Sequence, residues 1–151
     1  MKPLYIFDID GTLADLTHRL HFIKQHKPDW DAFHDACDGD KPIANVIKVF
    51  KRIEFDDKAD IWFFTGRPET HRDATHEWIR QKMWHWSMDE KLTMRPKGNF
   101  TPDDQLKEQW LNNMLDVDRE RLVAVFDDRD RVCRMFRRNG VTCFQVAEGD
   151  F

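Results

Sequence analysis

Short apolar runs that stop abruptly at polar residues are the feature that most restricts how this chain can fold. The three clearest runs cover residues 4–7, 61–64 and 122–126, and they end in Asp8-Ile9-Asp10, Thr65-Gly66 and Asp127-Asp128. A fourth run covers 141–146, and a weaker one covers 92–94. Runs that are apolar at successive positions are typical of parallel strands covered by helices on both faces.

Amphipathic stretches fit between these runs. An apolar stripe follows Pro42 through residues 43–53, a helix is expected to begin at Pro68, another is expected over Thr101–Leu115, and a last one is expected to stop at Asn139-Gly140. Alternating strands and helices predict a doubly wound α/β fold with a parallel sheet of about five strands. We expect one domain over residues 1–151, with a small helical insert at about 14–40 after the first strand.

The polar strand ends predict one site. Ligands of such sheets bind beyond the carboxyl ends of the strands, so Asp8, Asp10, Asp127 and Asp128 are expected to converge. A hard divalent cation offsets that concentration of negative charge, and Mg²⁺ prefers oxygen ligands. Solvated loop acids or helix caps are the alternative, which two acidic pairs at neighbouring strand ends disfavour.

At this point the sequence resembles a known family. Asp8-Ile9-Asp10-Gly11-Thr12-Leu13 resembles the first motif of the haloacid dehalogenase superfamily of phosphatases. The second, third and fourth motifs of that superfamily are matched by Thr65-Gly66-Arg67, Lys107 and Asp127-Asp128. Residues 103–108, 126–129 and 145–151 are similar to the 3′-phosphatase domain of bacteriophage polynucleotide kinases. No G-x-x-x-x-G-K-[ST] loop occurs in the sequence, so no kinase half is expected.

The resemblance implies a role for each residue of the site. Asp8 is the expected nucleophile and a metal ligand, and Asp10 is the acid–base that also lends Mg²⁺ its backbone carbonyl. Asp127 is expected to ligate the metal directly and Asp128 from the outer shell. Lys107 is the third expected catalytic residue, and Asp103 is expected to aim it. The residues expected to hold the phosphate are Thr65, Gly66, Arg67 and Arg19. Asp103 lies four residues before Lys107 and so on the same helical face.

The resulting hypothesis is a Mg²⁺-dependent phosphomonoesterase that removes 3′-terminal phosphates from DNA or RNA through an aspartyl-phosphate. The alternatives are a nucleotidase or small-molecule phosphatase, a phospho-accepting signalling domain, and a binding-only protein. The expected partner is a 3′-phosphorylated nucleic-acid end or nucleotide, with no membrane and no protein partner. Three cysteines without a CxxC pair and the lack of a signal peptide favour a cytoplasmic location.

Two weaker signals concern nucleic acid. Arg131, Arg134 and Arg138 form a helical stripe that is either the solvated side of a helix or a track for a phosphate backbone. Trp84 and Trp86 are either surface residues or a platform on which bases stack. The net charge of −4 means that any such binding depends on a local basic patch.

Overall fold

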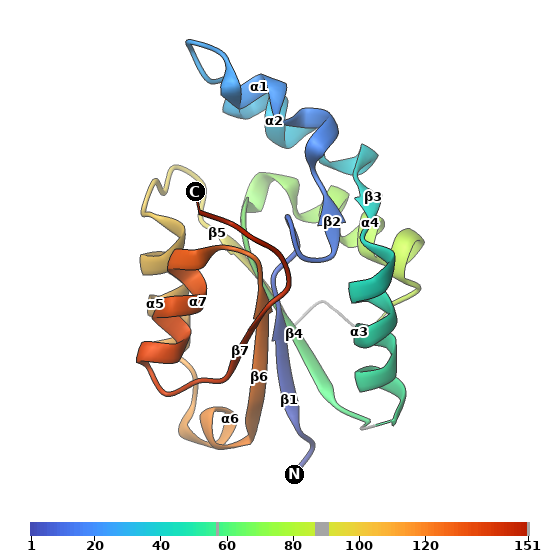
Figure 1. Ribbon diagram of the computed structural model, residues 1–151, viewed down its shortest axis with the longest axis vertical. Coiled ribbons are helices and arrows are strands. Elements are labelled where there is room, and N and C mark those ends of the chain that lie inside the picture. Colours follow the sequence, from blue (N-terminus) through green and yellow to red (C-terminus); the bar gives the residue numbers. More distant parts are fainter. Residues whose placement is uncertain (57, 87–90, 151) are drawn as a thin grey trace.

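A five-stranded parallel sheet forms the centre of the molecule. The computed structural model describes residues 1–56, 58–86 and 91–150, and Phe151, which closes the tail named above, lies outside them. The strand order is β5-β4-β1-β6-β7 (Figure 1). The strands are β1 Leu4–Phe7, β4 Asp60–Pro68, β5 Leu92–Arg95, β6 Leu122–Asp127 and β7 Cys143–Gln145. The predicted parallel sheet is confirmed.

Helices cover both faces of this sheet. Figure 1 shows α3 (Ala44–Asp56) and α4 (Arg72–Met83) on one side, and α5 (Asp103–Asn112) and α7 (Asp130–Arg138) on the other. A short α6 (Asp116–Arg121) leads into β6. Each face has its own core: Phe7 stacks on Phe126 beneath α3 with ring centroids 4.4 Å apart, and Phe136 packs with Leu111 on the opposite face. The doubly wound prediction is therefore also confirmed.

Residues 14–42, which we call the flap, leave the sheet after β1. The flap contains β2 (Ala14–Asp15), the 3₁₀ turn η1 (Thr17–Arg19), α1 (His21–Lys24), α2 (Trp30–Asp35), the turn η2 (Cys37–Gly39) and β3 (Lys41–Pro42). β2 and β3 pair antiparallel and close the base of the flap. In Figure 1 the flap projects beyond the carboxyl ends of the strands. The assignment of the whole chain to one domain stays a prediction.

Two predicted helix boundaries are wrong. Pro68 is not a first helical residue: its backbone is extended (ψ 148°), it ends β4, and the turn η3 (Glu69–His71) separates it from α4. The helix expected over Thr101–Leu115 begins at Asp103 and ends at Asn112. Pro102 is also extended (ψ 145°), so the helix begins after it, and Leu115 instead precedes α6.

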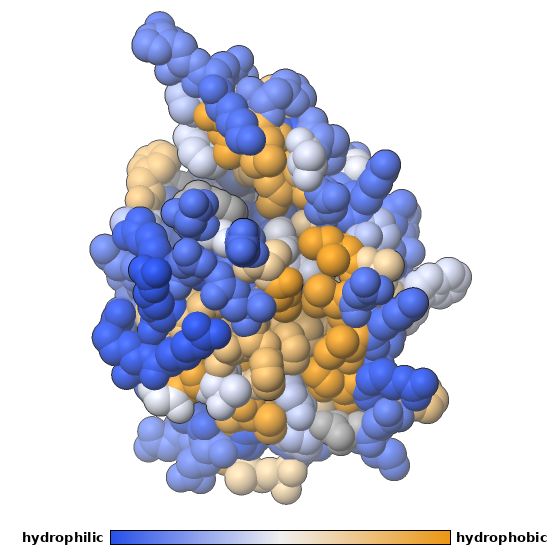
Figure 2. Space-filling view, viewed as in Figure 1, coloured by the Kyte–Doolittle hydropathy of each residue, from blue (hydrophilic) through white to orange (hydrophobic). Residues whose placement is uncertain are grey.

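Apolar residues reach the surface beside the last strands. Figure 2 shows them between α3 and the C-terminal strands, and Val123 and Phe144 are 46% and 53% exposed. In residues 1–56, 58–86 and 91–150, no helix is both long and apolar enough to cross a membrane.

Candidate active site

Three buried carboxylates meet at the carboxyl ends of β1 and β6. The two strands pair in parallel, which brings Asp8 beside Asp127 and Asp128, and one ligand oxygen from each lies within 4.8 Å of the others. Gly11 makes room for this arrangement. Its φ is +81°, and a Cβ there would lie 2.2 Å from an Asp128 carboxylate oxygen, so this turn requires glycine.

Lys107 of α5 neutralises part of this cluster. Its fully buried Nζ donates to Asp8 Oδ1 at 2.9 Å and to Asp127 Oδ2 at 2.8 Å. Burial would lower the pKa of Lys107, but the surrounding carboxylates raise it well above its usual value, so the ammonium stays charged. A buried cation is thus fixed between the two strand-end acids.

Asp103 lies one helical turn before Lys107 and borders the same cluster. Its Oδ2 is 3.4 Å from Lys107 Nζ, and it also faces Arg95 and Arg129 at 3.4 and 3.5 Å. A Cβ at position 66 would lie 2.4 Å from its Oδ1, so Gly66 is the residue that lets β4 approach Asp103. Burial opposes ionisation of Asp103, but the charge of Lys107 lowers its pKa.

The carboxylates themselves are electrostatically crowded. Burial raises the pKa of Asp8 well above its ordinary value, although Lys107 opposes the shift. Burial and the neighbouring Asp127 raise the pKa of Asp128 to about 6. Lys107 is shared among Asp8, Asp127 and Asp103, so the three clustered carboxylates retain excess negative charge, and their oxygens are the ligand type that hard divalent cations prefer. The cluster therefore fits a divalent metal ion.

Asp10 belongs to a different set of contacts. Its Oδ1 accepts from Arg67 Nε at 3.0 Å, from Arg67 Nη2 at 2.6 Å and from Arg19 Nη2 at 2.8 Å. Burial alone would raise the pKa of Asp10, but the two guanidiniums lower it to about 2. The Asp10 side chain is not part of the carboxylate cluster formed by Asp8, Asp127 and Asp128.

Asp40 is the site residue that sequence reasoning missed. Its buried carboxylate accepts from Arg19 Nε at 2.8 Å and Nη2 at 2.7 Å, and from Arg67 Nη2 at 2.9 Å. Arg19 and Arg67 are almost fully buried between Asp10 and Asp40. Each arginine thus already holds two carboxylates, while the phosphate contact expected of them stays a prediction. An acid that follows Gly39 in the flap gave no sequence signal.

Thr65 and Gly66 lie where β4 reaches the site. Thr65 is fully buried, and its Oγ1 accepts from the backbone N–H of Arg67 at 3.2 Å. The fold thus gathers Asp8, Asp127, Asp128, Lys107 and Asp103 into one cluster. Arg67, which follows Gly66 on β4, links this strand to the second cluster around Asp10.

The flap is fastened to the second cluster. Arg19 donates to the Phe33 carbonyl at 3.2 Å, and its guanidinium lies 4.2 Å from the centre of the Phe33 ring. His71 of η3 contacts Asp35 of α2 at 2.8 Å and so joins the flap to the β4–α4 connection. Burial lowers the pKa of His34 to about 4, so this imidazole, close to Asp10 and His71, is neutral at pH 7.

The arginine stripe of α7 is partly engaged within the protein. Arg131 and Arg138 lie 3.5 Å from Asp104 and Glu108 of α5, which favours the solvated-side interpretation over a phosphate track. Trp84 and Trp86, by contrast, are 74% and 65% exposed and lie at the far end of α4.

Comparison with known proteins identifies relatives of this arrangement. The profile of the polynucleotide kinase PNKP phosphatase domain matches residues 2–151. A putative bifunctional polynucleotide kinase/RNA ligase of Autographa californica nuclear polyhedrosis virus is 31% identical over 130 residues, which is 86% of this chain but 17% of the viral protein. The chain therefore spans a small part of that relative.

Solved structures share the fold. A chain of the Pnkp1/Rnl/Hen1 complex superposes with a TM-score of 0.76 and 24% identity over 99% of this chain and 47% of its own length. The class C acid phosphatase from Bacillus anthracis with tungstate bound gives a TM-score of 0.70 at 14% identity, over 99% of this chain and 68% of that one. At these identities the likeness concerns the fold.

Proposed function

This chain belongs to the phosphatase-domain family of polynucleotide kinase PNKP, and we propose that it removes 3′-terminal phosphates from polynucleotides through an aspartyl-phosphate on Asp8. Membership of this family makes it a phosphomonoesterase-type hydrolase of the haloacid dehalogenase fold. The observation that carries the assignment of Asp8 is the bridge from Lys107 to both Asp8 and Asp127, beside Asp128.

Asp8 is the proposed nucleophile because it lies at the centre of the charged groups. Lys107 donates to Asp8 Oδ1 at 2.9 Å, and Oδ2, which has only a long 3.5 Å contact from the Thr12 hydroxyl among the described residues, is the oxygen proposed to attack phosphorus in line. Asp8, Asp127 and Asp128 would hold the metal, and we propose Mg²⁺ as that ion. A bound divalent cation supplies charge neutralisation for the phosphate and lowers the pKa of Asp8. Asp103 acts through Lys107, whose ammonium it holds in place.

Asp10 is the proposed general acid. It protonates the departing ester oxygen and then takes the proton of the water that hydrolyses the aspartyl-phosphate. With Arg19 and Arg67 paired to it, the Asp10 carboxyl is ionised at pH 7. An entering phosphate competes for both guanidiniums and places negative charge beside Asp10, and both changes raise its pKa. In this proposal Arg19, Arg67 and Thr65 hold the phosphate, and Asp10 takes up a proton as the substrate binds.

The substrate class rests on the relatives. The matching profile is that of a polynucleotide kinase phosphatase domain, and the viral relative is described as a polynucleotide kinase/RNA ligase. A chain similar to this one occurs in the Pnkp1/Rnl/Hen1 complex. For this protein a nucleic-acid 3′ end is the proposed substrate, and the expectation of no protein partner stays a prediction.

Rates on four substrates test the proposal. The substrates are a 3′-phosphorylated oligonucleotide, the same oligonucleotide with a 5′-phosphate, a nucleoside 3′-monophosphate and a nucleoside 5′-monophosphate. We expect the highest kcat/KM on the 3′-phosphorylated oligonucleotide and no turnover by Asp8→Asn. Equal efficiency on the 3′-mononucleotide would identify a nucleotidase, and preference for the 5′-phosphate would contradict the proposed substrate.

A further inference from the structure

We propose that the outer face of α3, together with Trp84 and Trp86, binds the single strand that leads away from the terminal phosphate. We call this surface the α3 track, and it consists of Lys41, Lys48, Arg52, Trp84 and Trp86. The inference extends the substrate contacts of the proposed function and rests on that function. It predicts a second contact with the polymer, several nucleotides from the reacting phosphate.

The two tryptophans are held outward by specific contacts. His85 between them is buried and contacts Glu54 of α3 through its Nδ1. Lys51 of α3 donates to the Trp84 carbonyl at 3.2 Å. Residues 84–86 are thus fastened to α3 by one backbone contact and one side-chain contact. The imidazole of His85 is buried, and both indoles are exposed. Two indoles exposed by a pinned segment form a preformed aromatic surface.

The backbone and the neighbouring cation fit this interpretation. Trp84 has φ +55° and ends α4 in the left-handed conformation, with its backbone N–H donating to the Arg80 carbonyl at 3.1 Å, which fixes where the chain leaves the helix. The Arg80 guanidinium lies 4.9 Å from the centre of the Trp86 ring. Arg80 covers one face of the Trp86 indole and also lies 3.7 Å from Glu77. The opposite face of Trp86 and the exposed Trp84 indole are the surfaces proposed to stack on nucleobases, because stacking is indifferent to base identity.

A row of cations leads from the active site to these tryptophans. Lys48 and Arg52 are four residues apart on α3, so they share one face, and both are exposed. Lys41 is exposed and directly follows Asp40, which belongs to the second cluster around Asp10, so it stands at the start of the row. Within the described residues, Lys41 and Lys48 form no ion pair, and Arg52 has only an exposed 3.7 Å contact with Asp56. In a chain of net charge −4, Lys48 and Arg52 supply two exposed cations on one helical face, while Lys41 lies opposite Asp15 across the β2–β3 pair.

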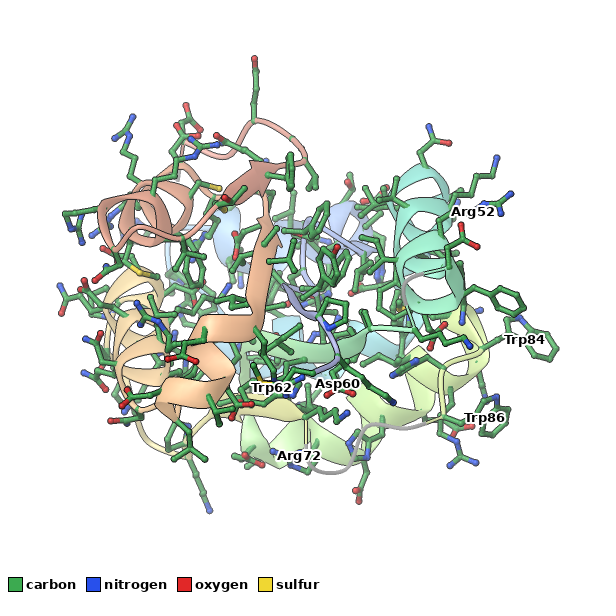
Figure 3. All side chains as sticks on the ribbon, turned by 90° about the horizontal axis from the view of Figure 1, so that it is seen from below. Arg52, Asp60, Trp62, Arg72, Trp84 and Trp86 are labelled. Atoms are coloured by element: carbon green, nitrogen blue, oxygen red, sulfur yellow. The ribbon has the colours of Figure 1, made fainter. Side chains whose placement is uncertain are left out.

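The length of α3 is sufficient to contact several consecutive nucleotides of a single strand. α3 has 13 residues, which corresponds to a length of about 20 Å, and it runs from beside the flap base to the segment that holds Trp84. Figure 3 shows Arg52, Trp84 and Trp86 along one edge of the molecule, with their side chains pointing outward. Phosphates along the cationic row and bases on the indoles are the pattern by which proteins bind single strands without sequence preference.

A binding experiment separates this inference from the proposed function. The probe is a fluorescently labelled single-stranded 12-mer that ends in a 3′-hydroxyl, so its binding does not depend on hydrolysis. We expect the Trp84→Ala/Trp86→Ala double variant to bind it about tenfold or more weakly. Lys48→Ala and Arg52→Ala should each reduce the slope of log affinity against log salt by about 0.7. Phe144→Ala and Arg134→Ala, which alter an exposed aromatic residue and an exposed arginine outside the track, are the matched controls.

Turnover provides the second measurement. The double variant should lose kcat/KM on a 3′-phosphorylated 12-mer by a similar factor and keep its rate on a 3′-mononucleotide within twofold, which also verifies the fold. Unchanged affinity for the 12-mer would overturn the track and leave the tryptophans as a surface for a protein partner. An equal loss on the mononucleotide would overturn it as well, because the effect would then reach the catalytic groups rather than the polymer.

Discussion

At the scale of single residues, the protonation state of Asp10 in the free protein is the opposite of the one its proposed role requires. Arg19 and Arg67 both donate to its Oδ1 and hold its pKa at about 2, whereas a general acid must carry a proton when the ester bond breaks. The conflict disappears if substrate phosphate draws the guanidiniums away. The chemical role of Asp10 is therefore best tested by varying how much the leaving group needs a proton.

We expect Asp10→Asn to reduce turnover of nucleotide esters by ~10²–10⁴-fold. The first step with p-nitrophenyl phosphate should be partly spared, because p-nitrophenolate leaves without protonation. Single-turnover formation of the phosphoenzyme, measured with both substrates, checks this expectation. Equal losses on the two substrates would mean that Asp10 orients the arginines and donates no proton.

Asp40 is the second residue with a specific expectation. Asp40→Asn removes the negative charge that pairs with both Arg19 and Arg67. Breaking a buried ion pair of this kind typically costs ~3–5 kcal/mol of folding stability. We expect a lower melting temperature and, well below it, weaker inhibition by inorganic phosphate, because the misplaced guanidiniums bind phosphate poorly. Asp38→Asn, an exposed acid two residues earlier, is the control. Normal phosphate inhibition in Asp40→Asn would limit Asp40 to a purely structural role.

At the scale of elements, the sequence predicts what is local. The strands are short runs of buried residues that stop at polar ones, so their positions and parallel arrangement follow from the pattern alone. The sequence determines helix ends less closely than strands, because Pro68 and Pro102 are acceptable both inside a first turn and just before one. The flap has little periodicity, since much of it is held by single contacts to α4 and η3, such as those of Trp78 with the Asp40 carbonyl and of His71 with Asp35.

The same distinction explains which site residues were found. The acids of β1 and β6 follow their strands directly, so the fold class places them together. Asp40 meets Arg19 and Arg67 from 21 and 27 residues away through an irregular flap, and no local pattern encodes that contact. Lys107 was predicted because its spacing matched a family motif, while its two contacts with Asp8 and Asp127 required the structure.

The flap should respond to pH through His34. Burial is the main cause of its lowered pKa of about 4, and it faces Asp10, His71, Arg19 and Arg67. The unfolded chain takes up this proton near pH 6.5 and the folded protein near 4, so folding stability is lost as pH falls through that window. We expect His34→Gln to lose less stability between pH 6.5 and 4, measured by urea unfolding, than the wild type. His26→Gln, an exposed flap histidine, should behave like the wild type. Identical pH slopes in all three proteins would contradict a neutral, half-buried His34.

At the scale of the whole molecule, the active site concentrates like charge where the two halves of the sheet meet. Asp8 directly follows the central strand β1, and Asp127 ends the neighbouring strand β6. The two carboxylates therefore come from different parts of the sheet. Lys107, reaching across from α5, forms ion pairs with both carboxylates. A divalent cation bound by both strand ends would therefore stabilise the fold as a whole and not only the site.

Metal binding should accordingly raise the melting temperature. A ligand at 100 times its Kd stabilises the folded state by ~2.7 kcal/mol, and for a chain of this size each kcal/mol shifts the melting temperature by about 2–4 °C. We expect Mg²⁺ at that excess to raise the wild-type midpoint by about 5–10 °C, and a chelator to reverse the shift and abolish turnover. Asp127→Asn should lose most of the shift, whereas Asp116→Asn, an exposed acid on α6, should keep it. Because the readout is thermal unfolding, it tests the metal site independently of catalysis; an equal shift in Asp127→Asn would place the bound ion elsewhere on the protein.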